Sequence, residues 1–314
     1  MTEYALATIL RDGKAMAAVR AGGRLWPLAE CSRRLGTRRL PNDLARIFVG
    51  WERHRGAVEA VAASCAAADL DGGLAIDAAA AHFLAPLRYP RKVVAIGANY
   101  ADHMAAVMGV LTEMGYRAPE SPMPRPLFFL KPATTAIVGP GPTIRIPPGC
   151  RQLDWEIELA AIIGRQVTDA PVDEAIAAVA GYTVSLDMSA RDRQLVPGTL
   201  FGFDFFGGKA HDTGCPMGPV VVPAASVTDP QDLRMRLSVN GTIRQDASTA
   251  GMINSVAETI SQASRIMTLE PGDVVLTGTP AGTGVESGTF LAPGDTISAT
   301  IDGIGTLDLS VRAD

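Results

Sequence analysis

Two glutamates separated by a single residue, Glu156 and Glu158, lie in the segment DWEIELAAIIG. Its apolar residues predict a strand, and side chains alternate between the two faces of a strand, so both carboxylates point the same way. Asp187 ends a second predicted strand, YTVSLD. Carboxylates gathered near a core repel one another unless protons or a cation compensate. Because hard oxygen ligands suit Mg²⁺, Mn²⁺ or Ca²⁺, the pattern indicates a divalent-metal site. An exposed strand face with two solvated glutamates is the alternative.

The elements that must position these acids are mostly strands. Apolar runs at 92–100, 127–131 and 274–278 predict buried strands, and the C-terminal tail predicts a hairpin that turns at Asp302-Gly303. Helices are expected around DEAIAAVA, between Pro171 and Gly181, and over SVAETISQASRIM, where Ser255 and Glu258 form a plausible capping box. No GxGxxG motif follows a strand. The fold class expected is therefore mainly β or α+β, without an open parallel α/β sheet.

The first 88 residues have a separate character. Short strands joined by glycine turns are predicted at the N-terminus, and the alanine-rich stretch 43–68 has helical spacing. We place a domain boundary near residue 88, between a small unit (1–88) and a larger one (89–314). Within the larger unit, residues 101–126 carry several glycines and prolines, which predicts a long irregular loop that serves as a lid.

The composition narrows the class of protein. A net charge of −5 gives no reason to expect nucleic acid or an anionic membrane as a partner. No apolar run approaches the roughly 18 residues of a membrane span, and the N-terminus MTEYALATILRDG lacks the pattern of a signal peptide. The four cysteines are scattered and form no CxxC pair, which favours reduced thiols. We expect a cytoplasmic protein.

Six segments occur in an order that carries a family resemblance: GANYADH (97–103), FFLKP (128–132), DWEIELAAIIG (154–164), SLDMSARDRQ (185–194), GKAHDTGCPMGP (208–219) and LTGTPAGTG (276–284). Over about residues 90–312 the chain resembles the fumarylacetoacetate hydrolase family, of the acylpyruvate hydrolase or 2-hydroxyhepta-2,4-diene-1,7-dioate isomerase type. The small N-terminal unit also fits the accessory domain of that family. The resemblance implies a mixed β-roll catalytic domain, a small N-terminal α+β domain and a homodimer.

The resemblance also implies roles for particular residues. Glu156, Glu158 and Asp187 match the carboxylates that hold one Mg²⁺ or Mn²⁺ ion per subunit. His103 matches a lid histidine that acts as general base, and Lys209 matches a lysine that stabilises developing oxyanion charge. The positions that match substrate contacts are Tyr100, Arg191, Gln194, Gly278 and Thr279.

The chain departs from the family pattern in its lid. Many single-domain relatives carry a glutamate three residues after the lid histidine, where this chain has Ala106. Glu113 or Glu120 are alternative partners for His103. The segment 104–126 is also longer than in the plainest relatives and rich in methionine, which suggests a pocket shaped for a bulkier or more apolar substrate.

The function expected from these residues is cleavage of a C–C bond in a 2,4-dioxo, acylpyruvate-like acid, as in aromatic or sugar-acid catabolism. A 2-oxo acid is the expected small-molecule partner, and its products are a carboxylate and a pyruvate-type acid. One alternative is an isomerase or decarboxylase of unsaturated 2-oxo dicarboxylates, or an oxaloacetate decarboxylase. Another is a non-enzymatic binding or structural protein whose carboxylates only stabilise the roll.

Overall fold

The structure is a computed structural model, and it describes residues 3–67, 70, 73–113, 115, 125–196 and 202–312. In the N-terminal part the described strands are β1 (Ala5–Arg11), β2 (Lys14–Ala21), β3 (Arg24–Pro27), β4 (Ile76–Asp77) and β5 (His82–Leu84). Its described helices are α1 (Leu28–Arg34), α2 (Leu44–Val49) and α3 (Trp51–Ala66). The predicted strands and helical stretch are therefore confirmed, with Gly50 dividing the latter into α2 and α3.

The C-terminal part is rich in strands. Those described are β6 (Val93–Gly97), β7 (Leu127–Lys131), β8 (Ile137–Val138), β9 (Gly141–Ile144), β10 (Leu153–Asp154), β11 (Ile157–Ile163), β12 (Val179–Leu186), β13 (Ser189–Ala190), β14 (Cys215–Pro223), β15 (Arg234–Val239), β16 (Thr242–Ser248), β17 (Val274–Leu276), β18 (Thr296–Ile301) and β19 (Gly305–Val311). The helices described there are α4 (Ala101–Glu113), α5 (Val172–Ala177), α6 (Arg191–Gln194), α7 (Phe205–Lys209), α8 (Val256–Ile266) and α9 (Gly284–Ser287). Two short 3₁₀ turns, η1 (Ala224–Ser226) and η2 (Thr249–Gly251), complete the description.

Two large sheets organise the molecule. The larger follows the order β4-β3-β2-β1-β14-β12-β11-β17-β6-β7, and the other follows β16-β15-β18-β19-β9. Strand pairing is mixed, because β17 runs parallel to β6 and β19 parallel to β9, whereas β11 and β12 are antiparallel. Strands β11, β12 and β14 pack against strands of the second sheet, which closes the layers into a roll. The expectation of a mainly β, α+β fold with a mixed sheet is confirmed.

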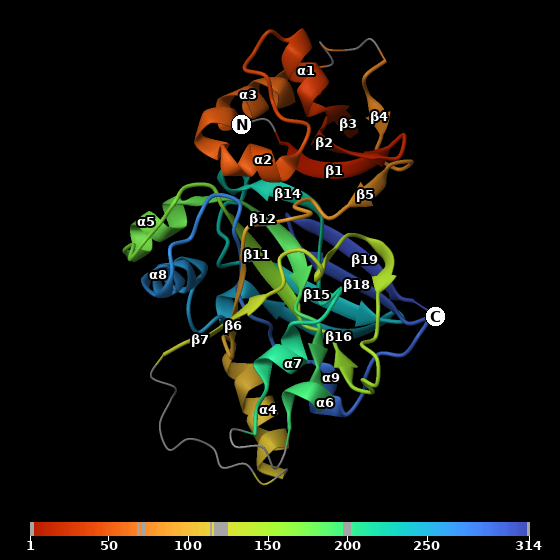
Figure 1. Ribbon diagram of the computed structural model, residues 1–314, viewed down its shortest axis with the longest axis vertical. Helices are drawn as coiled ribbons and strands as arrows, with labels where there is room; N and C mark the ends of the chain where they lie inside the picture. The colour runs from red at the N-terminus through yellow and green to blue at the C-terminus, as the bar shows by residue number, and fades with distance from the viewer. Residues whose placement is uncertain are drawn as a thin grey trace.

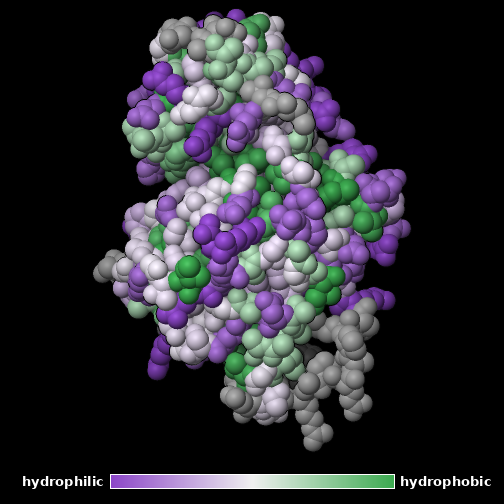
Figure 2. Space-filling view, turned by 180° about the vertical axis from the view of Figure 1, so that it is seen from behind, coloured by the Kyte–Doolittle hydropathy of each residue, from purple (hydrophilic) through white to green (hydrophobic). Residues whose placement is uncertain are grey.

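The N-terminal part is joined to the rest by both hydrogen bonds and apolar packing. Strand β1 pairs with β14, with Leu6 opposite Val221, so the small unit extends the large sheet. One buried cluster contains residues of both parts, among them Trp26 and Leu276. The N-terminal part lies at one end of the elongated molecule and α4 at the other (Figure 1). Seen from behind, hydrophobic residues gather along the junction between the small unit and the roll (Figure 2). The domain boundary near residue 88 stays a prediction.

Three local expectations need correction. The stretch Ala101–Glu113 forms helix α4 instead of an irregular loop, and most of 114–124 lies outside the described residues. Helix α5 ends at Ala177, and Gly181 lies inside β12, where a Cβ would come within 2.6 Å of the Val222 carbonyl oxygen. Glu156 immediately precedes β11 and does not lie within it. The capping box of α8 is present as predicted, since Ser255 and Glu258 bond each other's backbone N–H.

None of the helices described in the structure is both long enough and apolar enough to cross a membrane.

Candidate active site

A cavity of about 340 Å³ opens at the end of the roll where α4, α6 and α7 gather. Figure 1 shows these helices on the side of the molecule away from the N-terminal part. The floor of the cavity carries the carboxylates of Glu156, Glu158 and Asp187, and one wall is formed by α4. The three acids predicted to bind metal therefore face a space large enough for a small substrate.

The register of two buried strands brings the three acids together. Ile157 of β11 pairs with Leu186 of β12, and the Asp187 N–H donates to the Glu156 carbonyl at 2.9 Å. Glu158 projects from β11 toward the same space. One carboxylate oxygen from each of the three residues lies within 4.8 Å of the others, and none of the three residues is more than 4% exposed. The interpretation as an exposed strand face is therefore wrong.

Two of the acids are neutralised by neighbouring cations. Lys209 Nζ donates to Glu156 Oε2 at 2.7 Å and to Asp187 Oδ2 at 2.6 Å, and Arg191 Nη2 donates to Glu156 Oε1 at 2.5 Å. Burial opposes ionisation of Glu156, but attraction to Lys209 and Arg191 outweighs it and holds the pKa of this carboxyl well below its ordinary value. Burial likewise disfavours the charged Lys209, yet attraction to Asp187 and Glu156 raises its pKa. Lys131 Nζ also bonds Asp187.

Glu158 is in a different environment. Its Oε2 accepts a 2.6 Å hydrogen bond from the Gly278 N–H, and no cationic side chain among the described residues forms an ion pair with it. Burial raises the pKa of Glu158 well above its ordinary value, and repulsion from Asp187 and Glu156 raises it further. A divalent cation would stabilise the ionised form against both effects.

The donor set fits a hard divalent ion. Metal–oxygen distances of about 2.0–2.6 Å place opposite ligand oxygens on one divalent ion roughly 4–5 Å apart. The three carboxylate oxygens lie within 4.8 Å of one another, so they are close enough to share one ion. Within the described residues of the cluster, carboxyl groups outnumber cations by four to three: Asp154, Glu156, Glu158 and Asp187 against Lys131, Arg191 and Lys209. The triad could therefore hold Mg²⁺ or Mn²⁺. With a divalent ion bound, these four carboxylates and three cations would carry a net charge of about +1, which favours an anionic substrate.

The backbone N–H of Gly278 donates to Glu158 from a backbone conformation that residues other than glycine rarely adopt. Its φ is +90°, a region that L side chains rarely adopt, and a Cβ would lie 2.7 Å from Asn99 Cβ. Gly278 is not among the lining residues of the cavity, so its observed role is to hold a carboxylate. Thr279, the next residue, does line the cavity.

His103 faces the carboxylates from the first turn of α4, and a distant residue orients it. Its Nδ1 lies 2.7 Å from Glu286 Oε1 in α9. Glu286 is itself fixed by Thr283 Oγ1, which donates to Oε1 at 2.9 Å, and by the Gly282 N–H, which donates to Oε2 at 2.7 Å. Burial raises the pKa of Glu286, but these hydrogen bonds and the contact with His103 outweigh it, so the net shift is downward.

Glu286 is therefore the carboxylate that pairs with His103, in place of the glutamate that many relatives carry at the position of Ala106. The two alternatives considered, Glu120 and the side chain of Glu113, lie outside the described residues. Sequence reasoning missed Glu286 because it is 183 positions from His103. The available signal was its place two residues after the shared segment LTGTPAGTG.

Asp154 was also missed, although it opens the segment that contains both metal-binding glutamates. It is fully buried, and its Oδ2 accepts from Arg191 Nε at 2.8 Å. The same carboxylate accepts from the Gly284 N–H at 2.5 Å and the Val285 N–H at 3.0 Å at the start of α9. Asp154 thus ties the arginine of the site to the helix that carries Glu286.

The predicted substrate contacts are only partly brought together. Arg191 and Gln194 line the cavity, and Arg191 Nη1 donates to Gln194 Oε1 at 3.0 Å. That bond engages the amide oxygen of Gln194, whose N–H₂ group is a hydrogen-bond donor. Tyr100 is 1% exposed, its hydroxyl has no hydrogen-bond partner in the described structure, and it is not among the lining residues. Its role as a substrate contact stays a prediction.

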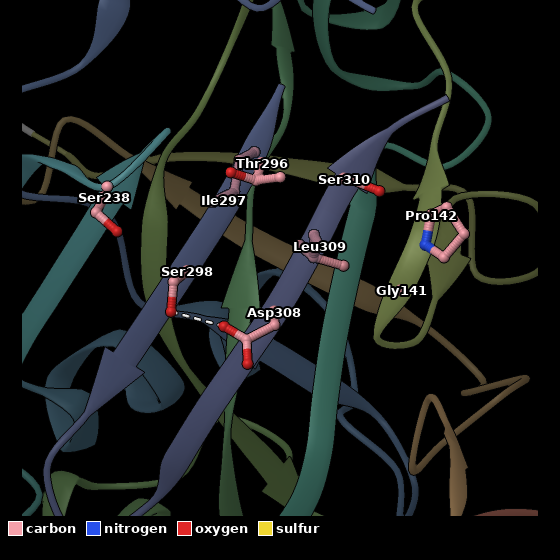
Figure 3. A pocket seen from close by; sticks show the side chains of 10 residues that line it. Gly141, Pro142, Ser238, Thr296, Ile297, Ser298, Asp308, Leu309 and Ser310 are labelled. Carbon is pink, nitrogen blue, oxygen red and sulfur yellow. Dashed lines mark hydrogen bonds between the residues drawn. The ribbon is translucent and has the colours of Figure 1, made fainter. Parts of the chain in front are cut away.

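A second hollow lies on the outer face of the smaller sheet and has a different character. It measures about 420 Å³ and is lined by small polar and apolar side chains of β15, β18 and β19 and of the β9 segment. Figure 3 shows that Asp308 accepts a hydrogen bond from Ser298, at 2.6 Å. The described lining has no histidine, cysteine or second acid. It therefore lacks the groups that would make a catalytic or metal site.

The fold and the carboxylate cavity define the class: a β-roll enzyme with a buried acidic triad opposite a paired histidine. The profile described as "Fumarylacetoacetate (FAA) hydrolase C-terminal" matches residues 92–312. The chain belongs to the fumarylacetoacetate hydrolase family.

Individual relatives point to more than one reaction. Oxaloacetate tautomerase FAHD2A, mitochondrial, of Bos taurus is 41% identical over 228 residues, 72% of this chain and 68% of that protein. The crystal structure of maleylpyruvate hydrolase from Sphingobium sp. SYK-6, in complex with manganese(II) ion and pyruvate, is 30% identical with a TM-score of 0.71, covering 98% of each chain. Fumarylpyruvate hydrolase from Pseudomonas aeruginosa, in complex with Mn²⁺ and pyruvate, is 36% identical with a TM-score of 0.61, covering 72% of this chain and 91% of that one.

Proposed function

We propose that the protein is a divalent-metal-dependent hydrolase that cleaves the C3–C4 bond of a 2,4-dioxo acid. The observation that carries the proposal is one cavity lined by the acidic triad and by His103, which is paired with Glu286 behind it. Glu156, Glu158 and Asp187 would hold Mg²⁺ or Mn²⁺. That ion would supply Lewis-acid stabilisation of negative charge on the 2-oxo acid end of the substrate.

His103 is the proposed base. With Nδ1–H donating to Glu286, the lone pair of Nε2 is free to take a proton from water. The water oxygen adds to C4, and the C3–C4 bond then breaks with its electron pair leaving on the pyruvate enolate. C3 is finally protonated, so the products are a carboxylate and pyruvate. This is the arrangement expected of a base oriented by a third group.

Lys209 and Gln194 complete the proposed chemistry. A lysine ammonium has three donors, and Glu156 and Asp187 use two of those on Lys209. The third is left for the oxyanion that develops at C4. The Gln194 amide, turned by its bond to Arg191, would donate to the substrate carboxylate.

Metal dependence gives the direct test, using acetylpyruvate as substrate and pyruvate release as the measurement. We expect chelation with EDTA to abolish turnover and Mg²⁺ or Mn²⁺ to restore it, because the Lewis acid that stabilises negative charge on the substrate is removed. Glu158→Gln should remain inactive at added metal concentrations that restore the parent. Glu174→Gln, an exposed carboxylate on α5, is the matched control and should behave as the parent. Full activity in exhaustively stripped protein would overturn the proposal.

A second candidate is oxaloacetate tautomerisation, which the names of several relatives favour. The same residues would serve, since His103 would carry a proton between C3 and the C2 oxygen while no C–C bond breaks. Product analysis separates the two reactions: hydrolysis yields two fragments, whereas tautomerisation conserves mass and changes the enol absorbance. Isomerisation of an unsaturated acid also conserves mass, and decarboxylation releases CO₂.

A further inference from the structure

The cavity has two chemically different halves. Its acidic and basic lining residues, among those described, all belong to the linked cluster around the triad: His103, Glu156, Glu158, Asp187, Arg191 and Lys209. The cations of this group are already bonded to carboxylates. Most of the other described lining side chains are apolar.

One wall of the apolar half is a single face of α4. His103, Val107 and Leu111 follow at intervals of four residues and line the cavity, together with Met104 and Met108. Residues at this spacing share one side of a helix. The opposite side of α4 is exposed at Ala105 and Gly109. A rise of 1.5 Å per residue places Leu111 about 12 Å along the axis from His103, so the wall continues for two turns beyond the base.

Another part of the lining is aromatic. Lys209 Nζ lies 5.4 Å from the ring centroid of Phe129, whose ring packs on Phe205 at 5.4 Å between centroids. Phe205 in turn stacks on Phe203 at 6.0 Å. These rings form a continuous series that starts at the catalytic lysine, and Leu127 and Leu195 extend the apolar lining.

We propose that this channel, bounded by the Met104–Leu111 face of α4 and the Phe129–Phe205–Phe203 series, binds an unbranched aliphatic or aryl acyl group and rejects a terminal carboxylate. The orientation of the substrate rests on the proposed function, which places the 2-oxo acid end at the triad. The acyl group then extends past His103 into the apolar half. A second carboxylate there would lose its hydration without gaining a partner among the described residues, which is costly.

Binding of 2-oxo acids tests this independently of turnover, because acids without a 4-oxo group are not cleaved. Calorimetry in the presence of Mn²⁺ would compare 2-oxobutanoate, 2-oxohexanoate and 2-oxooctanoate with 2-oxooctanedioate. We expect Kd to fall about fourfold for each added methylene, as burial of one CH₂ predicts. The diacid should bind at least 100-fold more weakly than 2-oxooctanoate. A Kd that does not depend on chain length, or tighter binding of the diacid, would refute the proposed role of the channel.

A charge placed at the far end of the channel gives a second test. Leu111→Arg should tighten binding of 2-oxooctanedioate and weaken that of 2-oxooctanoate, which reverses the preference. Ala105→Arg adds the same charge to the exposed side of α4 and should leave the preference unchanged. Met108→Lys serves if Leu111→Arg fails to fold, as thermal melting would reveal. Equal preferences in the channel variants and in Ala105→Arg would overturn the proposal.

The two proposals can fail separately. If 2-oxo acids follow the chain-length series but no acylpyruvate is cleaved, the channel stands and the hydrolase assignment falls. If acetylpyruvate is cleaved with Mg²⁺ but longer and shorter 2-oxo acids bind equally, the hydrolase assignment stands and the channel is refuted.

Discussion

At the scale of single residues, the orientation of His103 depends on a carboxylate from the far end of the chain. Glu286 holds Nδ1 at 2.7 Å and is fixed by Thr283 and Gly282. Glu286 is not among the described lining residues of the cavity, and its contact with that lining is the bond to His103, so it acts through the histidine. It is a positioning residue, and its removal should affect turnover more than binding.

We expect His103→Ala to lower kcat by roughly 10²–10⁴, the usual range for loss of a general base. Glu286→Ala should lower kcat within that range, because the imidazole loses its orientation. Calorimetric binding of 2-oxobutanoate in the presence of Mn²⁺ should change little in either variant. Glu270→Gln removes a carboxylate bonded to Arg91 and Lys92, remote from the site, and is the control. A normal kcat in Glu286→Ala would assign the orientation of His103 to another residue.

Gly278 provides a second residue-scale prediction. Alanine there would combine strain at φ +90° with a Cβ placed 2.7 Å from Asn99 Cβ, and the displaced N–H would no longer reach Glu158. We expect a loss of roughly 1–3 kcal/mol in unfolding free energy, together with weaker Mn²⁺ binding. Gly303→Ala is a matched control, since its φ is +75° but no atom lies within 4 Å of the added Cβ. Unchanged Mn²⁺ affinity in a folded Gly278→Ala protein would contradict the assigned role.

At the scale of elements, residue patterns predicted about half of the described strands and one helix end in detail, whereas β14, β15 and β16 were not predicted. Helix α8 begins at the predicted capping box, where Ser255 Oγ accepts from the Glu258 N–H at 3.2 Å. Short-range patterns of this kind are read directly from neighbouring residues. Helix α4 was missed because Gly109 and the prolines after it dominate the local pattern, whereas its apolar face at 104, 107, 108 and 111 is buried only by tertiary packing.

Ser255→Ala should destabilise the protein by about 1 kcal/mol, because the start of α8 loses its cap. Ser226→Ala, at an exposed position in η1, should have little effect. Hydrogen bonds from the Ser255 hydroxyl and N–H lower the pKa of Glu258 below its ordinary value. Its contribution is therefore complete above about pH 4.3, the ordinary glutamate pKa, and is lost as pH falls through the lower folded pKa. Urea unfolding of Glu258→Gln should show a larger difference from the parent at pH 7 than at pH 3.

At the scale of the whole molecule, the two parts of the chain share one sheet, and both buried clusters contain residues of each part. Leu6 pairs opposite Val221, and a Cβ at Gly164 would lie 2.5 Å from the ring of Trp51. Such contacts between segments far apart in sequence leave no local pattern, so the sequence could suggest two units but not their continuity. For the same reason the sequence did not reveal Glu286 and Asp154, whereas the triad was predicted from the spacing of Glu156 and Glu158 together with the family resemblance, which added Asp187 as a ligand.

We expect a single cooperative unfolding transition in which both parts unfold together. Trp26 and Trp51 report on the N-terminal part, and Trp155 reports on the site. The Trp155→Phe variant therefore follows the first part by fluorescence, and the double variant Trp26→Phe, Trp51→Phe follows the second. In each variant the thermal transition seen by fluorescence should coincide with the one measured by calorimetry. Leu6→Ala, at a fully buried position, should lower the free energy of unfolding reported by both fluorescence signals by roughly 2–5 kcal/mol. Early loss of the N-terminal signal alone would show that the boundary near residue 88 separates independent domains.

The homodimer and the cytoplasmic location remain proposals taken from the family resemblance and the composition. Sedimentation equilibrium at several protein concentrations tests the first, and a species of one chain at micromolar concentration would contradict it.

Helix α4 joins recognition to reactivity in one rigid body, because its first turn carries His103 and its third carries Leu111. A long acyl tail that docks against the third turn therefore also restrains the first. Part of its intrinsic binding energy would then appear as a faster chemical step and not as tighter ground-state binding. Across a series of acylpyruvates, lengthening the tail should raise kcat as well as lower KM, so that the enzyme discriminates against short substrates in the transition state.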